Sequence, residues 1–174
     1  MTDCPKRNLS PGGSTGGEGA LLGIRGSILG IGTDVGGSIR IPATYNGIYG
    51  LRPSYNRIPH NGTPSLPDGQ GMMPAVMGPM SATIDGLKVF VKAMMDANPW
   101  DRDPLTPRIP WNEGKYLLED HGKGERLCFG MMWDDGVCKP QPPILRAMEE
   151  TKQALLAAGH EGKSSESFGI LIRG

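Results

Sequence analysis

Apolar side chains recur at helical spacing in the middle of the chain. The pattern predicts a helix that Ser81 or Thr83 can cap and that Asn98-Pro99 ends. Its apolar face is formed by residues three or four positions apart, namely Ile84, Leu87, Val91 and Met94 or Met95. Because such a face needs a partner surface, this helix is expected to cover a sheet.

A second helix is predicted after the pair Pro142-Pro143, which suits a first helical turn, and it ends at Gly159. The residues expected to face inward are Ile144 or Leu145, Met148, Leu155 and Ala158. A short helix is also predicted over residues 18–24, behind Gly16-Gly17.

Short apolar runs predict strands at residues 27–32, 48–52 and 126–133. Residues 54–80 contain many Pro, Gly and Asn and have no clear period, so they are predicted to form a long surface loop. These elements indicate an α/β fold with a mixed β-sheet covered by helices. The strands near residues 28–31 and 48–52 are expected to be adjacent.

The composition is close to the limit for a globular chain. There are 27 glycines and 16 prolines in 174 residues, near the level of about 25–30% at which low complexity becomes an alternative. Disorder of that kind also needs a high net charge, whereas here 18 basic residues balance 18 acidic ones. The balance excludes a nucleic-acid binder that works by bulk positive charge, so no nucleic-acid partner is expected.

No apolar run approaches the ~20 residues that a membrane-spanning helix needs, and the N-terminus does not resemble a secretory signal. The three cysteines, Cys4, Cys128 and Cys138, are odd in number and widely spaced, which favours free thiols in a reducing compartment. The histidines have no metal-ligand spacing. A cytoplasmic protein without a metal or cofactor is the expectation.

Glycine is concentrated in residues 12–37, where 11 of the 26 residues are glycine. This density permits close backbone approach and indicates a site. Gly12-Gly13-Ser14-Thr15-Gly16 fits a nucleophile elbow, but the apolar strand that must precede it is missing. A phosphate loop would need Gly-Lys-Ser or Gly-Lys-Thr, and a dinucleotide fingerprint starting at Gly30 fails at Val35.

A third interpretation joins two serines, Ser14 and Ser38. The backbone N–H groups of Val35, Gly36 and Gly37, directly before Ser38, can converge on a developing oxyanion. Ser38 is therefore a candidate nucleophile.

These motifs, in this order and spacing, resemble the amidase signature hydrolases, most closely the fungal acetamidase-like and fatty-acid-amide-hydrolase-like branch. The matching stretches are residues 10–21, 30–43 and 47–53, and a looser similarity covers roughly residues 8–161.

The resemblance implies an amidase that hydrolyses small-molecule carboxylic acid amides through an acyl-enzyme intermediate, with no cofactor. Its mechanism would use a Ser–cis-Ser–Lys triad, in which Ser38 is the nucleophile and Ser14, held by a cis peptide bond after Gly13, is the bridging serine. The oxyanion hole would be formed by Val35, Gly36 and Gly37. The supporting positions would be Thr15, Asp34 and Arg40.

The family's lysine precedes the bridging serine by several tens of residues, whereas 13 residues precede Ser14 here, and Lys6 is too close to be its counterpart. The chain is therefore interpreted as an internal amidase fragment that is inactive in isolation. Residues 1–161 would form a partial amidase signature domain with a motif core at residues 10–53. Residues 162–174 would form an atypical tail, expected to be disordered. The alternative is a catalytically inactive remnant or a wrongly delimited gene fragment of an amidase.

Overall fold

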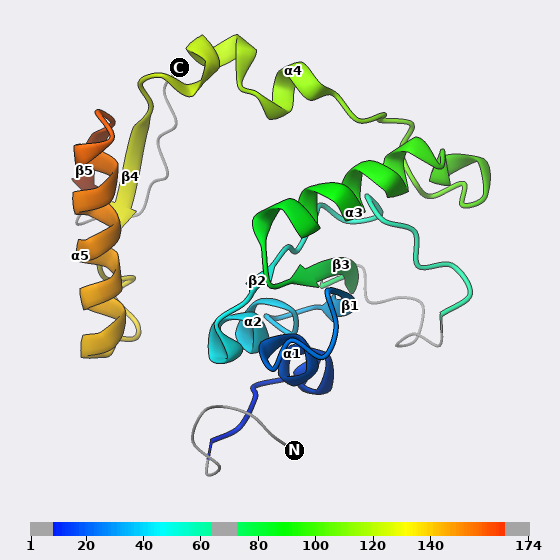
Figure 1. Ribbon diagram of the computed structural model, residues 1–174, viewed down its shortest axis with the longest axis horizontal. Coiled ribbons are helices and arrows are strands. Elements are labelled where there is room, and N and C mark those ends of the chain that lie inside the picture. The colour runs from blue at the N-terminus through cyan, green and yellow to red at the C-terminus, as the bar shows by residue number, and fades with distance from the viewer. Residues whose placement is uncertain (1–8, 64–72, 166–174) are drawn as a thin grey trace. The chain divides into compact units, whose positions relative to one another are not determined.

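The computed structural model describes residues 9–63 and 73–165 and confirms an α/β fold (Figure 1). Cys4, Lys6 and residues 166–174 of the predicted tail lie outside the described residues. The chain divides into two compact units, Met1–Trp111 and Asn112–Gly174. The elements of the first unit are α1 (Gly16–Gly23), β1 (Leu29–Asp34), α2 (Arg40–Asn46), β2 (Tyr49–Gly50), β3 (Val76–Ser81), α3 (Ile84–Asp96) and the 3₁₀ helix η1 (Pro99–Asp101).

The first unit contains an antiparallel sheet with the strand order β1-β3-β2. The prediction that the first two strands are adjacent is wrong, because β3 lies between them. The prediction of a long surface loop over residues 54–80 is also wrong at its end, because β3 begins at Val76. Pro79 hides this strand from a sequence pattern, because proline is normally excluded from the middle of a sheet.

The position of Pro79 also explains why β2 is short. The Leu51 N–H donates to the Pro79 carbonyl at 3.0 Å, but Pro79 has no N–H to donate back across the strand pair. The neighbouring Gly78 allows a close approach, since a Cβ on this residue would collide with the Leu51 carbonyl oxygen. Pairing therefore stops after two residues, and the chain leaves the sheet at residue 51.

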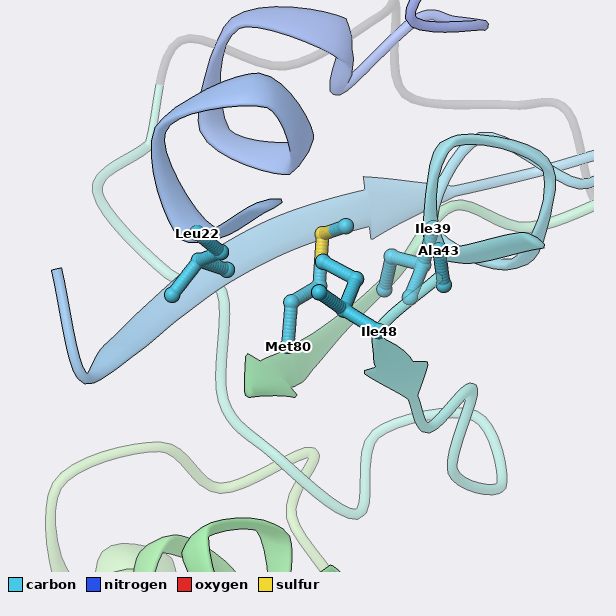
Figure 2. Packing of buried hydrophobic residues seen from close by; sticks show 5 residues of the cluster. All are labelled: Leu22, Ile39, Ala43, Ile48 and Met80. Atoms are coloured by element: carbon cyan, nitrogen blue, oxygen red, sulfur yellow. The ribbon is translucent and has the colours of Figure 1, made fainter. Parts of the chain in front are cut away.

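The core of the first unit lies between the sheet and the helices α1 and α2. It consists of Leu22, Ile39, Ala43, Ile48 and Met80, which converge in Figure 2. Helix α3 lies on the opposite side of the sheet (Figure 1).

Helix α2 has no counterpart in the sequence prediction. Its Pro42 occupies the first turn, where a missing N–H removes no intrahelical hydrogen bond.

Helix α3 confirms the predicted amphipathic helix and its cap. The Thr83 hydroxyl accepts a hydrogen bond from the Gly86 N–H at 3.1 Å. Met95 is buried on its apolar face, and Leu87 and Val91 are half-buried. Ile84, predicted to face inward, is 58% exposed because it lies in the first turn, beyond the edge of the covered surface.

The second unit contains α4 (Glu113–Tyr116), the 3₁₀ helix η2 (Glu119–Gly124), β4 (Cys128–Met132), α5 (Pro142–Ala157) and β5 (Glu161–Ser165). Strands β4 and β5 are parallel and are connected through α5, which confirms the predicted strand and the predicted second helix. The half-buried apolar residues of α5 are Leu145, Met148 and Leu155, whereas Ile144 and Ala158 are exposed. Residues 162–165, which have no pattern in the sequence, pair with β4. The boundary of the predicted tail stays a prediction.

Candidate active site

Ser38 lies in a tight turn between the end of β1 and the start of α2. Gly37, directly before it, has φ +129, a conformation that favours glycine. A Cβ on Gly37 would also lie 2.8 Å from Cδ1 of Ile41. The Ile41 N–H donates to the Gly37 carbonyl at 2.7 Å, which fastens the turn to the first turn of α2.

The turn is organised by the carboxylate of Asp34, which is fully buried. Its Oδ1 accepts hydrogen bonds from the Gly37 N–H at 2.7 Å and from Nη2 of Arg40 at 3.0 Å. Its Oδ2 accepts from the Ile39 N–H at 3.1 Å, the Arg40 N–H at 3.4 Å and the Arg40 Nε–H at 3.0 Å. Both oxygen atoms are therefore saturated by donors from the turn and from α2.

These contacts set the charge state of Asp34. Burial alone would raise the pKa of this carboxyl, because it disfavours the charged form. The hydrogen bonds from the Arg40 side chain and from the backbone N–H groups outweigh that effect and hold the pKa of Asp34 well below its usual value. Asp34 is thus an anionic anchor for the turn that carries Ser38.

The segment that carries Ser14 lies beside this turn. The Gly13–Ser14 peptide bond is cis, as the resemblance implies. The Thr15 N–H donates to the Ser38 carbonyl at 3.1 Å, and Thr15 Oγ1 donates to the Thr33 carbonyl at 3.3 Å and accepts from the Thr33 N–H at 3.4 Å. Thr15, the residue after Ser14, is therefore hydrogen-bonded to the backbone of Ser38.

Ser14 is exposed and Ser38 is half-buried. Among the described residues, no hydrogen bond joins the two hydroxyls, so a direct Ser14–Ser38 contact stays a prediction. The N–H groups of Val35, Gly36 and Ser38 donate to no group within the described ranges, whereas the Gly37 N–H is already paired with Asp34.

Sequence reasoning missed two residues that support the site. The side-chain Nδ2 of Asn46 donates to the carbonyls of Pro11 and Pro42, both at 2.8 Å, and so ties the Ser14 segment to α2. Arg52 places Nε 3.7 Å from Asp34 Oδ1. The contacts of Asn46 with Pro11 and of Arg52 with Asp34 have no local sequence signal, because each joins segments that only the fold brings together.

The described ranges contain no cluster of three or more His, Cys, Asp or Glu side chains suited to a metal ion. Cys128 and Cys138 are free thiols. None of the helices in the described part of the chain combines the length and the apolar character that crossing a membrane requires.

Comparison with known proteins agrees with this geometry. The family model described as Amidase matches residues 1–166. The chain is 42% identical to the acetamidase of Emericella nidulans over 155 residues, which is 88% of this chain and 28% of that protein. It is 40% identical to fatty-acid amide hydrolase 1 of Sus scrofa over 151 residues, 87% of this chain and 25% of that protein.

Solved structures give the same result. A fatty acid amide hydrolase superposes with a TM-score of 0.80 at 39% identity, covering 90% of this chain and 27% of that one. A bacterial aryl acylamidase superposes with a TM-score of 0.71 at 25% identity, covering 92% of this chain and 31% of that one. The chain spans less than a third of the length of these relatives. On the match of its motifs, its fold and nearly all of its length, the chain belongs to the amidase family.

Proposed function

We propose that this chain carries the nucleophile and the oxyanion-binding turn of a hydrolase of carboxylic acid amides. The observation that supports this most strongly is the turn at Ser38, which the buried Asp34 holds in place and which the Thr15 N–H joins to the Ser14 segment. A turn held only for stability would not require N–H groups without an acceptor beside a serine. Here the N–H groups of Val35 and Gly36 have no partner within the described ranges.

In the proposed reaction, Ser38 Oγ attacks the carbonyl carbon of the amide and passes its proton to Ser14 Oγ. Ser14 passes its own proton to a lysine, the last member of the triad that the resemblance implies. The tetrahedral intermediate collapses, the C–N bond breaks, and the leaving nitrogen takes the proton of Ser14, which the lysine then replaces. Water gives a proton to the same relay as it attacks the acyl group on Ser38, and that proton returns to Ser38 Oγ as the acid leaves.

Negative charge develops on the carbonyl oxygen during the attack. We assign its stabilisation to the N–H groups of Val35 and Gly36, since the Gly37 N–H is committed to Asp34. Gly37 then serves by giving the turn its shape. Thr15, Asp34 and Arg40 are positioning residues in this scheme, because they fix the two serine segments through hydrogen bonds.

The substrates are proposed to be small-molecule amides. Relatives named acetamidase and fatty-acid amide hydrolase differ in the acyl group that their names specify, which supports the amide bond as the shared feature rather than one acyl chain.

The experiment that tests this function is covalent labelling of the 174-residue chain with a fluorophosphonate, followed by intact mass and peptide mapping. Slow modification confined to Ser38 is expected, because losing a general base costs about 10²–10⁴ in rate while the oxyanion turn remains. Added methylamine at constant ionic strength should accelerate labelling by acting as an external base.

Variants make this test specific. Ser38→Ala should abolish labelling, Ser14→Ala should weaken the acceleration by methylamine, and Ser54→Ala, an exposed serine in a separate turn, should behave as wild type. Modification spread over several serines, or unchanged labelling of Ser38→Ala, would remove the nucleophile assignment.

The alternative is a catalytically inactive piece of an amidase. The chain covers 28% of the acetamidase and 27% of the solved fatty acid amide hydrolase. A chain that is folded by circular dichroism but is not labelled at Ser38, with or without methylamine, would support this alternative over the hydrolase.

A further inference from the structure

Asp34 faces two guanidinium groups that come from different parts of the first unit. Arg40 belongs to α2 and makes two side-chain hydrogen bonds at 3.0 Å. Arg52 follows β2 and approaches Oδ1 from its own segment, with its Nε at 3.7 Å. One carboxylate and two guanidinium groups leave this cluster with a net positive charge.

The two arginines contact Asp34 in different ways. The Arg40 contact is bidentate and geometrically fixed, which lysine cannot reproduce. The Arg52 contact is an ion pair that is too long for a hydrogen bond, so Arg52 acts on Asp34 through its charge. The Arg52 side chain is 30% exposed against 54% for Arg40, so solvent screens its charge less.

The sheet holds Arg52 in this position. The preceding Leu51 is hydrogen-bonded to the Pro79 carbonyl on β3 at 3.0 Å. The following Pro53 lies against Gly78, where an added Cβ would come within 2.8 Å of its Cδ. The charge therefore sits on a backbone segment fixed on both sides.

The oxygen that faces Arg52 is also the oxygen that accepts the Gly37 N–H at 2.7 Å. A single atom thus connects this cation to the turn that carries Val35, Gly36 and Ser38. We propose that Arg52 is a positioning residue for the proposed reaction. It acts through Asp34 to hold the Ser38 turn, and it adds the excess positive charge of the Asp34 cluster to the turn at which negative charge develops.

This inference rests on the proposed function, and labelling kinetics test both. With a fluorophosphonate, Arg52→Met should lower the maximal rate of Ser38 labelling about tenfold and leave the half-saturating reagent concentration unchanged. Arg52→Lys should stay within about twofold of wild type, since it keeps the charge, whereas Arg40→Lys should not. The matched control is Arg108→Met, which removes an exposed arginine paired with Asp101.

A second measurement is independent of reactivity. The amide proton of Gly37 should exchange with solvent about fivefold faster in Arg52→Met than in wild type. In Arg52→Lys and Arg108→Met it should exchange at the wild-type rate. Equal Gly37 exchange in wild type and Arg52→Met overturns the inference. Faster Gly37 exchange without a change in the labelling rate also overturns the inference, because Arg52 would then hold Asp34 without affecting the reactivity of Ser38.

The remaining outcomes separate the two proposals. Labelling of wild type with no effect of Arg52→Met leaves the proposed function standing and removes Arg52 from it. Absence of labelling in wild type removes the proposed function, and Gly37 exchange alone then decides whether Arg52 holds the turn. If Arg52→Met does not fold, the contrast between Arg52→Lys and Arg40→Lys decides, because the inference requires the first to be labelled within about twofold of the wild-type rate and the second to be labelled more slowly than that.

Discussion

At the scale of single residues, the turn depends on the carboxylate of Asp34. Asp34 accepts five hydrogen bonds and donates none. Asparagine has the same shape but offers one acceptor oxygen, and its amide group would face donors instead of acceptors. The site therefore uses the charge of Asp34 as well as its geometry.

We expect Asp34→Asn to lower the free energy of unfolding by about 3 kcal/mol, because buried donors and the Arg40 charge lose their partner. Urea denaturation followed by circular dichroism measures this change. Asp96→Asn is the matched control, since Asp96 is 55% exposed and, among the described residues, pairs with Lys92 on the surface of α3. Its expected cost is below about 0.5 kcal/mol. Equal losses in the two variants would contradict the role of Asp34.

The pH dependence of unfolding follows from the lowered pKa of Asp34. The unfolded chain takes up a proton near the ordinary value of 3.8, while the folded chain holds the carboxyl ionised to lower pH. This contribution is therefore complete above about pH 5 and is lost on acidification. The urea midpoint of wild type should fall more steeply between about pH 5 and pH 3 than that of Asp34→Asn. Parallel dependences of the urea midpoint on pH in wild type and Asp34→Asn would contradict this role of Asp34.

The sequence predicted the residues of this turn better than it predicted their supports. Val35, Gly36, Gly37 and Ser38 are contiguous, so one motif identifies them. Asn46 and Arg52 act on atoms of Pro11 and Asp34, which lie far from them in the chain. Such contacts depend on tertiary structure, and a single sequence contains no periodic or local signal for them.

At the scale of elements, periodicity predicted α3 and α5, and proline concealed α2 and β3. Amphipathic helices repeat their apolar positions over several turns, so the pattern survives local exceptions. Strand β3 has six residues and contains Gly78 and Pro79, two residues that argue against a strand. In the structure, the missing Cβ of Gly78 leaves room for the Leu51 carbonyl oxygen, and the missing N–H of Pro79 ends the pairing between β2 and β3.

Gly78→Ala tests this interpretation of β3. The added Cβ would collide with the backbone oxygen of Leu51, which no side-chain rotation can relieve. We expect the free energy of unfolding to fall by more than about 2 kcal/mol. Gly130→Ala in β4 is the control, because nothing lies within 4 Å of its added Cβ. It should be neutral or raise stability by about 0.5 kcal/mol. A neutral Gly78→Ala would show that residue 51 does not approach β3 this closely.

At the scale of the whole molecule, the described residues leave many large apolar side chains exposed. Ile28 and Val137 are 86% and 84% exposed, and Ile31 on β1 is 47% exposed. Strand β1 also forms an edge of its sheet. Apolar surface and an open strand edge are both features that favour association.

We therefore expect the purified 174-residue chain to bind a hydrophobic fluorescent dye under native conditions and to self-associate as its concentration rises. Dye fluorescence and sedimentation velocity measure the two effects. The Ile28→Lys, Val137→Lys double variant should lower both, since these side chains contribute exposed apolar surface and little packing. A monomeric chain that does not bind the dye would contradict this expectation.

The hydrogen bonds of Asp34 also bear on the order in which the protein can assemble during synthesis. All of their donors lie at most six residues further along the chain, so closing these contacts orders a very short loop. Strand β3 is translated much later, and Arg52 gains its fixed place only when β3 arrives. The local shape of the turn can therefore form on the ribosome before the sheet exists. When β3 pairs with the chain at Leu51, it fixes Arg52 beside Asp34. The second positive charge is therefore added to a turn that is already closed.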